Sequence, residues 1–428
     1  MLMSARDRTA RCTARPAVRS RQRRRPGLRF GALLALAFLT ALAVAAAPVQ
    51  ADPAPQAKWT VMVYMAGDNN LEKWVTHDIA REMAAVGSND DVRVVALADR
   101  APGHATGSGD WTGTLLFDVT AGMQPTPDQA VADWGERDMG SPQTLVDFVT
   151  WARANYPADR SALFLWDHGW GWWTGNTMAD ETSNDYLDMD ELRDALEVVG
   201  GVDMVGMDTC LPQMVEVEAE FRGFARAMAG SQDAIGYTGF AYDRIVAGLQ
   251  ADPAMTPAAL ATLAAKSMRA GHDKWTVAAS AVTLGRHWDA LASAVSDLGW
   301  DLACDLRDHR ATFGLARRHS ARLPQATYPE VRDLLSLAQE IRARSPSATI
   351  RRDCNRVITA LRRTVLYEWH TKAEGDLHGI SIFWPAAPAP PRAGSSFSQW
   401  VDFGYYCSQL TFTRLTYWGD FLAAWGRW

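Results

Sequence analysis

Two polar segments that could do chemistry each follow an apolar run. SALFLWD (161–167) runs directly into His168, and VDMVGMD (202–208) is followed two positions later by Cys210. An imidazole can take the proton of a thiol during attack on a carbonyl, and it can return that proton to a leaving amine. A pairing of His168 with Cys210 would therefore suit acyl transfer through a thioester.

A glycine stands directly after the histidine. Because Gly169 has no side chain, its N–H can come close to a substrate carbonyl. Together with the N–H of Cys210 it would form an oxyanion hole, in which each donor is worth on the order of 3 kcal/mol. The residue types alone are not specific, because free cysteines are often buried and structural, and His77, His104 and His378 compete for the same role.

The elements that would position these groups alternate between apolar strands and amphipathic helices from about residue 58. This alternation predicts an α/β fold with an open, mostly parallel sheet flanked by helices, whose ligands lie at the carboxyl ends of the strands. We expect strands at 58–65, 92–99, 115–119, 161–167, 202–208 and 225–232, and helices at 71–86, 141–156, 189–199 and from about 213.

Beyond about residue 250 the pattern becomes mostly helical. Helices are expected at 287–306, 328–344 and 354–371, with strands at 276–284 and 378–384. The predicted organisation is an α/β domain at 56–270 and a mainly helical C-terminal region at 271–428 that packs on it.

Several segments resemble the clostripain family of caspase-like cysteine peptidases in order and spacing. They are WTVMVYMAGDNNLE, MGSPQTLVDFVTWARANYPADRSALFLWDHGWGW, VDMVGMDTCLPQMVEVEAEF, GISIFWP and LTYWGDFLAAW, and they run from about residue 58 to 425. The resemblance implies a caspase-like sheet and an endopeptidase that cuts after arginine or lysine. It also implies that His168 is the catalytic histidine and Cys210 the nucleophile.

The resemblance places an acid of the substrate pocket two residues before the nucleophile, on Asp208. A carboxylate at the base of a pocket pairs well with a guanidinium or ammonium group. The alternative is that Asp208 only caps the helix that follows, since acids are favoured at helix N-termini. Asp233 is a second candidate pocket acid, with an ordinary loop position as its alternative.

One feature departs from the family pattern. Members commonly activate themselves by cutting at a basic residue between the histidine and cysteine strands, yet no Lys or Arg occurs from Ser161 to Leu192. Arg193 is the one basic residue left before Cys210, and it falls inside a predicted helix. Self-processing in this linker is therefore not expected.

The same linker is acidic, and some relatives in the family depend on calcium. Clustered carboxylates suit that ion, but the regular spacing of a calcium loop is absent, and solvated acids near a helix N-terminus explain the pattern better. We expect no required cofactor and no metal ligands, with calcium left open. The acids are Asp180, Glu181, Asp185, Asp188, Asp190 and Glu191.

The chain has 18 tryptophans, and four of them crowd the histidine. Trp166, Trp170, Trp172 and Trp173 could wall a substrate cleft. They also support a rival hypothesis, in which a secreted protein without catalysis stacks these rings on a glycan or peptide. A third hypothesis is a transpeptidase, because an amine can capture a thioester in place of water.

Residues 1–51 differ from the rest of the chain. Ten arginines and one acid lead into the apolar run GALLALAFLTALAVAAA, which is the pattern of a secretory signal peptide. A membrane anchor is the alternative, although the run is short for a bilayer span. We therefore predict an exported protein, secreted or held in the periplasm or cell envelope, with no stable membrane span after removal of the signal.

Removing 1–51 leaves 33 of the 43 basic residues and 48 of the 49 acidic residues, a formal net charge of −15. A nucleic-acid-binding protein needs a basic face, so this class is excluded. Cationic peptides would be attracted instead, and the expected partners are protein or peptide substrates.

Four cysteines lie beyond residue 51: Cys210, Cys304, Cys354 and Cys407. Without a CxxC motif or paired Cys/His spacing, a structural zinc site is not expected. In an oxidising compartment these cysteines could form two disulfides, or one disulfide beside two free thiols, and Cys304 and Cys354 are the pair that we expect.

Overall fold

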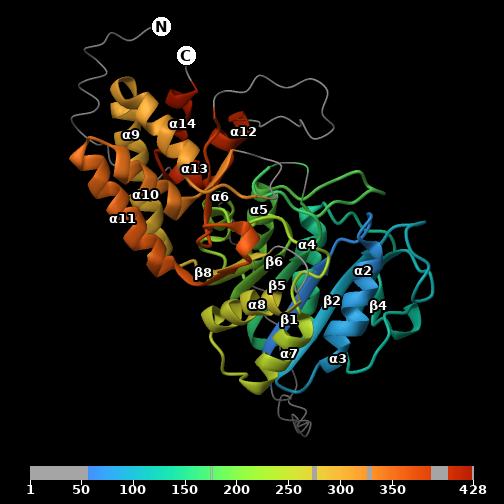
Figure 1. Ribbon diagram of the computed structural model, residues 1–428. Coiled ribbons are helices and arrows are strands. Elements are labelled where there is room, and N and C mark those ends of the chain that lie inside the picture. The colour runs from blue at the N-terminus through green and yellow to red at the C-terminus, as the bar shows by residue number, and fades with distance from the viewer. Residues whose placement is uncertain are drawn as a thin grey trace, which may run out of the picture. The chain divides into compact units, whose positions relative to one another are not determined.

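The computed structural model (Figure 1) has one compact unit that contains the helices and strands, Ala57–Trp428. The predicted signal peptide lies outside the described residues. None of the helices in the described part combines the length and the apolar character that crossing a bilayer requires. The structure describes residues 56–173, 175, 177–271, 277–324, 330–386 and 403–426.

A nine-stranded sheet in the order β10-β8-β7-β6-β5-β1-β2-β3-β4 forms the centre of this unit. The five strands from β7 to β2 in this order pair in parallel, and the strands at both edges pair antiparallel. The strands are β1 (Ala57–Met65), β2 (Val92–Arg100), β3 (Gly113–Asp118), β4 (Ala132–Asp133), β5 (Ala158–Trp166), β6 (Met204–Asp208), β7 (Ala227–Ser231), β8 (Ala278–Thr283) and β10 (Val365–His370). A separate pair joins β9 (Val331–Asp333) to β11 (Ser381–Phe383).

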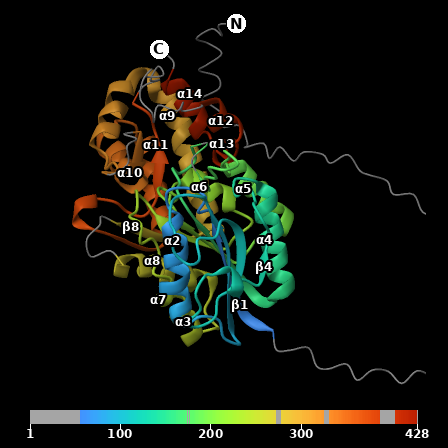
Figure 2. The same ribbon diagram turned by 90° about the vertical axis from the view of Figure 1, so that its right-hand side faces the viewer.

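Helices cover both faces of the sheet (Figures 1 and 2). One face packs on α2 (Glu72–His77), the π-helical segment η1 (Asp78–Met83), α3 (Ala84–Val86), α7 (Tyr242–Ala251) and α8 (Pro257–Gly271). The other packs on α4 (Pro142–Asn155), α5 (Met189–Val199), α6 (Val215–Phe221) and the C-terminal helices. Those helices are α9 (Arg286–His319), α10 (Leu334–Arg344), α11 (Ala348–Thr364), α12 (Phe403–Ser408), α13 (Thr411–Leu415) and α14 (Trp418–Trp425), while η2 (Pro127–Gln129) and η3 (Lys372–Glu374) are short 3₁₀ turns.

Local sequence explains the central elements. β1 and β6 are apolar almost throughout because both faces of a parallel sheet are covered. Helix α4 begins at Pro142 after Ser141, as predicted, since proline fits the first helical position. Helix α5 starts with a capping box between Asp188 and Glu191, which gives two acids of the linker a structural role.

The predicted helix at 354–371 is wrong in its last part. Helix α11 ends at Thr364, and Val365–His370 forms β10, which pairs antiparallel with β8. The segment VLYEWH is rich in β-branched and aromatic residues, which favour a strand when an edge is free to pair. The sheet therefore draws two strands from beyond residue 270.

The C-terminal region is tied to α6, the helix that follows the cysteine segment, through three buried glutamates. Glu216 accepts hydrogen bonds from the Phe383 N–H and the Tyr406 hydroxyl. Glu218 accepts from the indole N–H of Trp288. Glu220 contacts Arg193, and its carboxylate also accepts bonds from the first residue of α13. Burial raises the pKa values of Glu216 and Glu218 to about 7 and about 8.

The predicted bridge between Cys304 and Cys354 is wrong. Cys354 is a free thiol with 0% exposure on the inner face of α11. Apolar helix packing accounts for this cysteine, which behaves as a small hydrophobic side chain.

Candidate functional site

The two segments that carry the histidine and the cysteine leave neighbouring strands at the same edge of the sheet. β5 and β6 pair in parallel, with Trp166 opposite Asp208 at their carboxyl ends. His168 and Cys210 each follow two residues later and line one small pocket of about 70 Å³. The pocket residues are Leu71, Trp74, Trp166, Asp167, His168, Asp208, Cys210, Ile235, Gly236, Tyr237 and Gly239.

The cysteine lies in a sharp turn after β6. Leu211 has a φ of 60°, which is rare for leucine and occurs mostly where the chain must turn tightly. The Cys210 thiol accepts a hydrogen bond from the Ile235 N–H at 3.4 Å. Burial, together with the charge of Asp233, raises the pKa of Cys210 to about 11. The resting thiol is therefore protonated at neutral pH.

The histidine ring is oriented by an asparagine. Nε2 of His168 lies 2.8 Å from Oδ1 of Asn70. An amide oxygen only accepts, so Nε2 carries the proton and Nδ1 keeps its lone pair. Burial lowers the pKa of His168, although Glu181 raises it in part. The neutral imidazole is thus ready to accept a proton at Nδ1.

We predict that Asn70→Ala lowers kcat/KM by about 10- to 100-fold, mostly in kcat, because the ring loses its fixed orientation and tautomer. Asn70→Asp should keep most of the activity, since a carboxylate accepts the same bond. It should also move the acidic side of the pH–rate profile, which reports the ionisation of His168, to higher pH. The measurement is the pH dependence of kcat/KM for both variants. An Asn70→Ala enzyme with unchanged kcat and profile would contradict this role.

A second asparagine holds the segment before the histidine. Nδ2 of Asn69 donates to the Ala66 carbonyl, to Oδ1 of Asp167 at 2.9 Å and to the Ala179 carbonyl. The other Asp167 oxygen accepts from the Ala179 N–H. Asp167 is buried, so these bonds fix the loop that carries His168. Both asparagines lie in a turn at the end of β1, beside β5, and no sequence motif distinguishes them from ordinary turn residues.

Gly169 lies against the loop of the cysteine. A Cβ at this position would be 2.8 Å from Cβ of Thr209 and 3.4 Å from the Cys210 carbonyl oxygen. A side chain does not fit there without moving the backbone. The glycine therefore lets the histidine and cysteine loops approach each other.

Asp208 lies at the base of the pocket and is buried. Its carboxylate accepts hydrogen bonds from the Phe240 N–H at 3.2 Å and from the Tyr242 hydroxyl at 3.0 Å. Burial, and then the charge of Asp78, raises the pKa of Asp208 to about 7. The helix-cap alternative is wrong, because α6 begins only at Val215.

Asp233 is fully buried and is not one of the pocket residues. Its Oδ1 accepts the N–H of Ala234 at 2.7 Å, and its charge contributes to the raised pKa of Cys210. The structure thus places Asp208, and not Asp233, where a bound side chain could meet it.

The tryptophans divide into two groups. Trp172 and Trp173 stack on each other at 4.6 Å between ring centroids and are only 1% and 4% exposed. They pack on Phe383 and belong to the core, so they cannot stack on a ligand. At the pocket, Trp74 stacks with the exposed Tyr237 at 5.8 Å. Trp74 and Trp166 line the pocket, whereas Trp172 and Trp173, two of the four tryptophans predicted to wall a cleft, do not.

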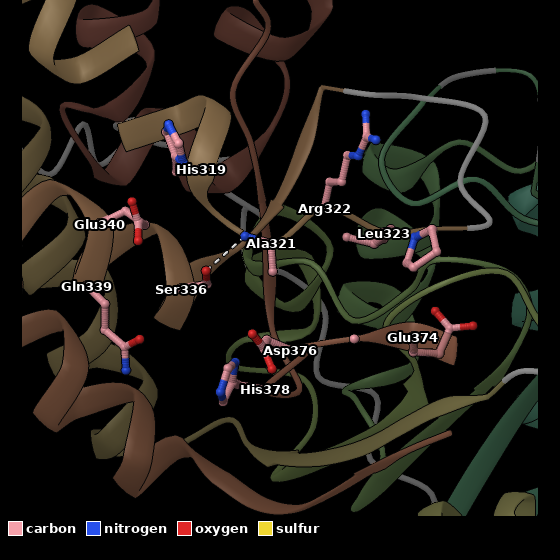
Figure 3. Close-up of a pocket in the computed structure, with 12 residues that line it drawn as sticks. His319, Ala321, Arg322, Leu323, Ser336, Gln339, Glu340, Glu374, Asp376 and His378 are labelled. Carbon is pink, nitrogen blue, oxygen red and sulfur yellow. Dashed lines mark hydrogen bonds between the residues drawn. The ribbon is translucent and has the colours of Figure 1, made fainter. Parts of the chain in front are cut away.

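A larger cavity of about 910 Å³ lies elsewhere, between α10 and the segment around His378 (Figure 3). His378 bonds to Asp333, and Ser336 faces the same cavity. The Ser336 hydroxyl accepts the Ala321 N–H, and Figure 3 draws no bond from it to His378. No cysteine lines this cavity in the described part of the chain, so the cavity offers no paired nucleophile and base.

Comparison with known sequences is consistent with this geometry. The sequence model of the clostripain family matches residues 63–425. Clostripain from Hathewaya histolytica is 27% identical over 217 residues, which are 44% of this chain and 41% of that protein. The match thus spans about two fifths of the length of that curated relative.

Solved structures show the same fold at low identity. An inactive zymogen C11 protease from Parabacteroides distasonis has a TM-score of 0.63 and 19% identity over 84% of this chain and 99% of its own. A secreted C11 cysteine protease from Bacteroides thetaiotaomicron has a TM-score of 0.61 and 14% identity over 86% of this chain and 100% of its own. The predicted caspase-like α/β fold is thereby confirmed.

Proposed function

Because this chain belongs to the clostripain family, we propose that it is a cysteine endopeptidase with Cys210 as nucleophile and His168 as general base and acid. The observation that carries the proposal is the shared pocket of these two side chains at the ends of β5 and β6. Thiol and imidazole need to be within reach of one substrate carbonyl, and their positions at the ends of adjacent parallel strands support this proposal.

The reaction follows from the protonation states. The Cys210 proton passes to Nδ1 of His168 while sulfur attacks the peptide carbonyl. The N–H groups of Gly169 and Cys210 are the proposed donors to the resulting oxyanion. His168 then gives its proton to the leaving amine, and a thioester remains. Water, deprotonated by His168, hydrolyses the thioester and restores the thiol.

Asp208 is the proposed specificity residue for arginine or lysine. Its carboxylate is buried, the charge of a second acid, Asp78, raises its pKa, and no Lys or Arg is among the described residues that line the pocket. A bound guanidinium would stabilise the ionised carboxylate through charge-assisted hydrogen bonds. The acidic mature chain would also attract cationic segments of substrates.

The linker between the two strands is proposed to stay uncut by the enzyme itself. Arg193 is inside α5, and its guanidinium is paired with Asp194 and Glu220. A helical, paired arginine cannot adopt the extended form that a peptidase cleft binds. Activity of an intact chain is the expected consequence.

Export is proposed from residues 1–51, whose charged and apolar segments have the order of a signal peptide. The Bacteroides thetaiotaomicron protein with the same fold is described as secreted. Protein and peptide substrates outside the cytoplasm fit both observations.

The test is hydrolysis of matched fluorogenic peptides that end in Arg, Lys, Asp or Leu, with and without an added amine. We expect release of the fluorophore from the peptides that end in Arg and Lys. Water is expected to be the main acceptor of the acyl group. Release only in the presence of the amine would favour the transpeptidase alternative. Absence of hydrolysis of all four peptides would contradict the proposed activity.

A further inference from the structure

The segment that follows β7, residues 232–235, lies against the thiol of Cys210. The Ile235 N–H donates to Cys210 Sγ at 3.4 Å, and the Ile235 carbonyl oxygen is 4.0 Å from the same sulfur. A backbone bond from the Leu211 N–H to the Asp233 carbonyl, at 3.3 Å, joins the segment to the cysteine loop. The contact between Ile235 and the sulfur therefore depends on how residues 232–235 are held.

The Ile235 N–H matters most after the thiol has lost its proton. A thiol can donate to the Ile235 carbonyl, whereas a thiolate can only accept, so the N–H becomes its partner. A hydrogen bond to an ionised group is roughly twice as strong as one between neutral groups. Burial raises the pKa of Cys210, and the Ile235 N–H lowers it in part. The charges of Asp233, Asp208 and Asp167 raise it further, so the thiolate depends on the donors that face it.

A buried glutamine anchors residues 232–235 to the C-terminal region. Gln232 is 1% exposed, and its side chain bonds to three groups of that region. Its Nε2 donates to Oδ2 of Asp333 at 2.9 Å and to the Ser381 hydroxyl at 3.0 Å, while its Oε1 accepts the Gly379 N–H at 2.7 Å. Both the amide nitrogen and the amide oxygen are thus engaged, which fixes the orientation of the side chain.

Asp333, the last residue of β9, is itself held firmly. It is 0% exposed, and its carboxylate caps α10 by accepting the Ser336 N–H at 2.8 Å. The same carboxylate accepts the His378 N–H at 2.7 Å and contacts His378 Nδ1 at 3.0 Å. His378 in turn lines the larger cavity (Figure 3). Gln232 is therefore tied to a well-bonded corner of the C-terminal region, and neither Gln232 nor Asp333 is among the described residues that line the pocket of Cys210.

We propose that the Ile235 N–H is a catalytic donor to the Cys210 thiolate and that Gln232 is the positioning residue that holds this donor in place. The inference rests on the proposed function, because it concerns the same thiol. Only two residues separate Gln232 from Ile235, so a shift of the anchor moves the donor. Hydrogen bonds weaken steeply when the donor is misaligned. The C-terminal region thus contributes to the chemistry without lining the pocket.

The first test is the rate at which iodoacetamide alkylates Cys210 as a function of pH, located by peptide mass spectrometry. The thiolate displaces iodide, so the rate reports ionisation of the thiol and needs no substrate. Gln232→Met keeps the length of the side chain and loses the bonds of the amide. We expect alkylation at neutral pH to slow about fivefold and its pH profile to move to higher pH. His168 lines the same pocket and is unchanged, and Cys407 is the internal reference.

Two further variants separate positioning from general stability. Ser381→Ala removes one partner of Gln232 with little change of shape, so it should fold even where Gln232→Met does not, and it should slow alkylation about twofold. Tyr406→Phe removes a different buried bond of the C-terminal region, the one to Glu216, and is the matched control. It should lower the Tm without changing the rate at Cys210. An unchanged rate in Ser381→Ala or in folded Gln232→Met, or equal slowing in Tyr406→Phe, would overturn the inference.

Peptide hydrolysis keeps this inference separate from the proposed activity. With the best arginyl peptide, Gln232→Met should lower kcat about fivefold and leave KM within about twofold, because the donor acts on the sulfur. A change in KM alone would contradict a positioning role. Absence of hydrolysis by the unsubstituted protein would contradict the peptidase proposal, whereas the alkylation rates would still decide the roles of Ile235 and Gln232.

Discussion

Cys210→Ala is expected to remove hydrolysis of Arg and Lys peptides, with a loss on the order of 10⁶ in kcat, as for other catalytic nucleophiles. Among the described residues, no other thiol lines the pocket of His168. Cys354 is fully buried in the helical region, and Cys407 packs near Gly419 in the C-terminal helices. The measurement is kcat with the best arginyl peptide.

The fold should survive this substitution. The Cys210 sulfur accepts one backbone N–H, and its loss removes little packing. We therefore expect the Tm to stay within a few degrees of the unsubstituted protein. Cys407→Ala is the matched control and should keep full activity. Activity of Cys210→Ala above a hundredth of the original, in a protein of normal Tm, would contradict the role of this thiol.

Asp208→Asn is expected to lower kcat/KM for arginyl peptides by on the order of 10²-fold, because a guanidinium loses its buried counter-charge. Asparagine has nearly the same shape and can still accept the Phe240 N–H and bond to Tyr242. The loss on a leucyl peptide should be much smaller. Paired kcat/KM values for the two peptides measure this difference.

The pH dependence of KM for arginyl peptides tests the same interaction between the Asp208 carboxylate and the guanidinium. The pKa of Asp208 is raised to about 7, so its charged form prevails only above that value. KM for arginyl peptides should therefore rise as the pH falls from 8 to 6, and Asp208→Asn should remove this dependence. Asp233→Asn, which replaces a buried acid outside the pocket, is the control. A greater loss of arginine preference in Asp233→Asn than in Asp208→Asn would contradict the assignment of Asp208 as the specificity residue.

Sequence patterns predicted the parts of the fold that depend on local properties. Apolar runs such as 161–167 and 202–208 became β5 and β6, because strands inside a covered parallel sheet are apolar on both faces. Since these strands follow one another through α5 and pair, the ends that carry His168 and Cys210 meet. The start of α4 was also predictable from local sequence, because Ser141 and Pro142 are typical of a helix N-terminus.

Features that depend on long-range contacts were not predictable in this way. VLYEWH (365–370) continues a helical pattern, and only the free edge of β8 makes it a strand. The charged side chains of Glu216, Glu218 and Glu220 predict exposed positions, yet all three are buried against the C-terminal region. The acidic linker was expected to be solvated, although Asp180 is buried and lies close to Asp68.

Local sequence also did not predict the residues that support His168. Asn70 belongs to a turn nearly a hundred residues before His168, and asparagine is common in turns. Its role becomes visible only when β1 and β5 are side by side. Trp172 and Trp173 were misleading for the opposite reason, since their nearness in sequence to His168 does not bring their rings into the pocket.

The most direct test of the account is to label the protein with a peptide that ends in an arginyl chloromethyl ketone and to locate the adduct by peptide mass spectrometry. The thiolate displaces chloride, so the peptide should appear on Cys210, and His168→Ala should suppress the reaction. Cys407, the other partly exposed free thiol in the described residues, serves as an internal control. Labelling of Cys210 alone is the predicted result, whereas preferential labelling of Cys407, or of neither thiol, would contradict a Cys210–His168 peptidase.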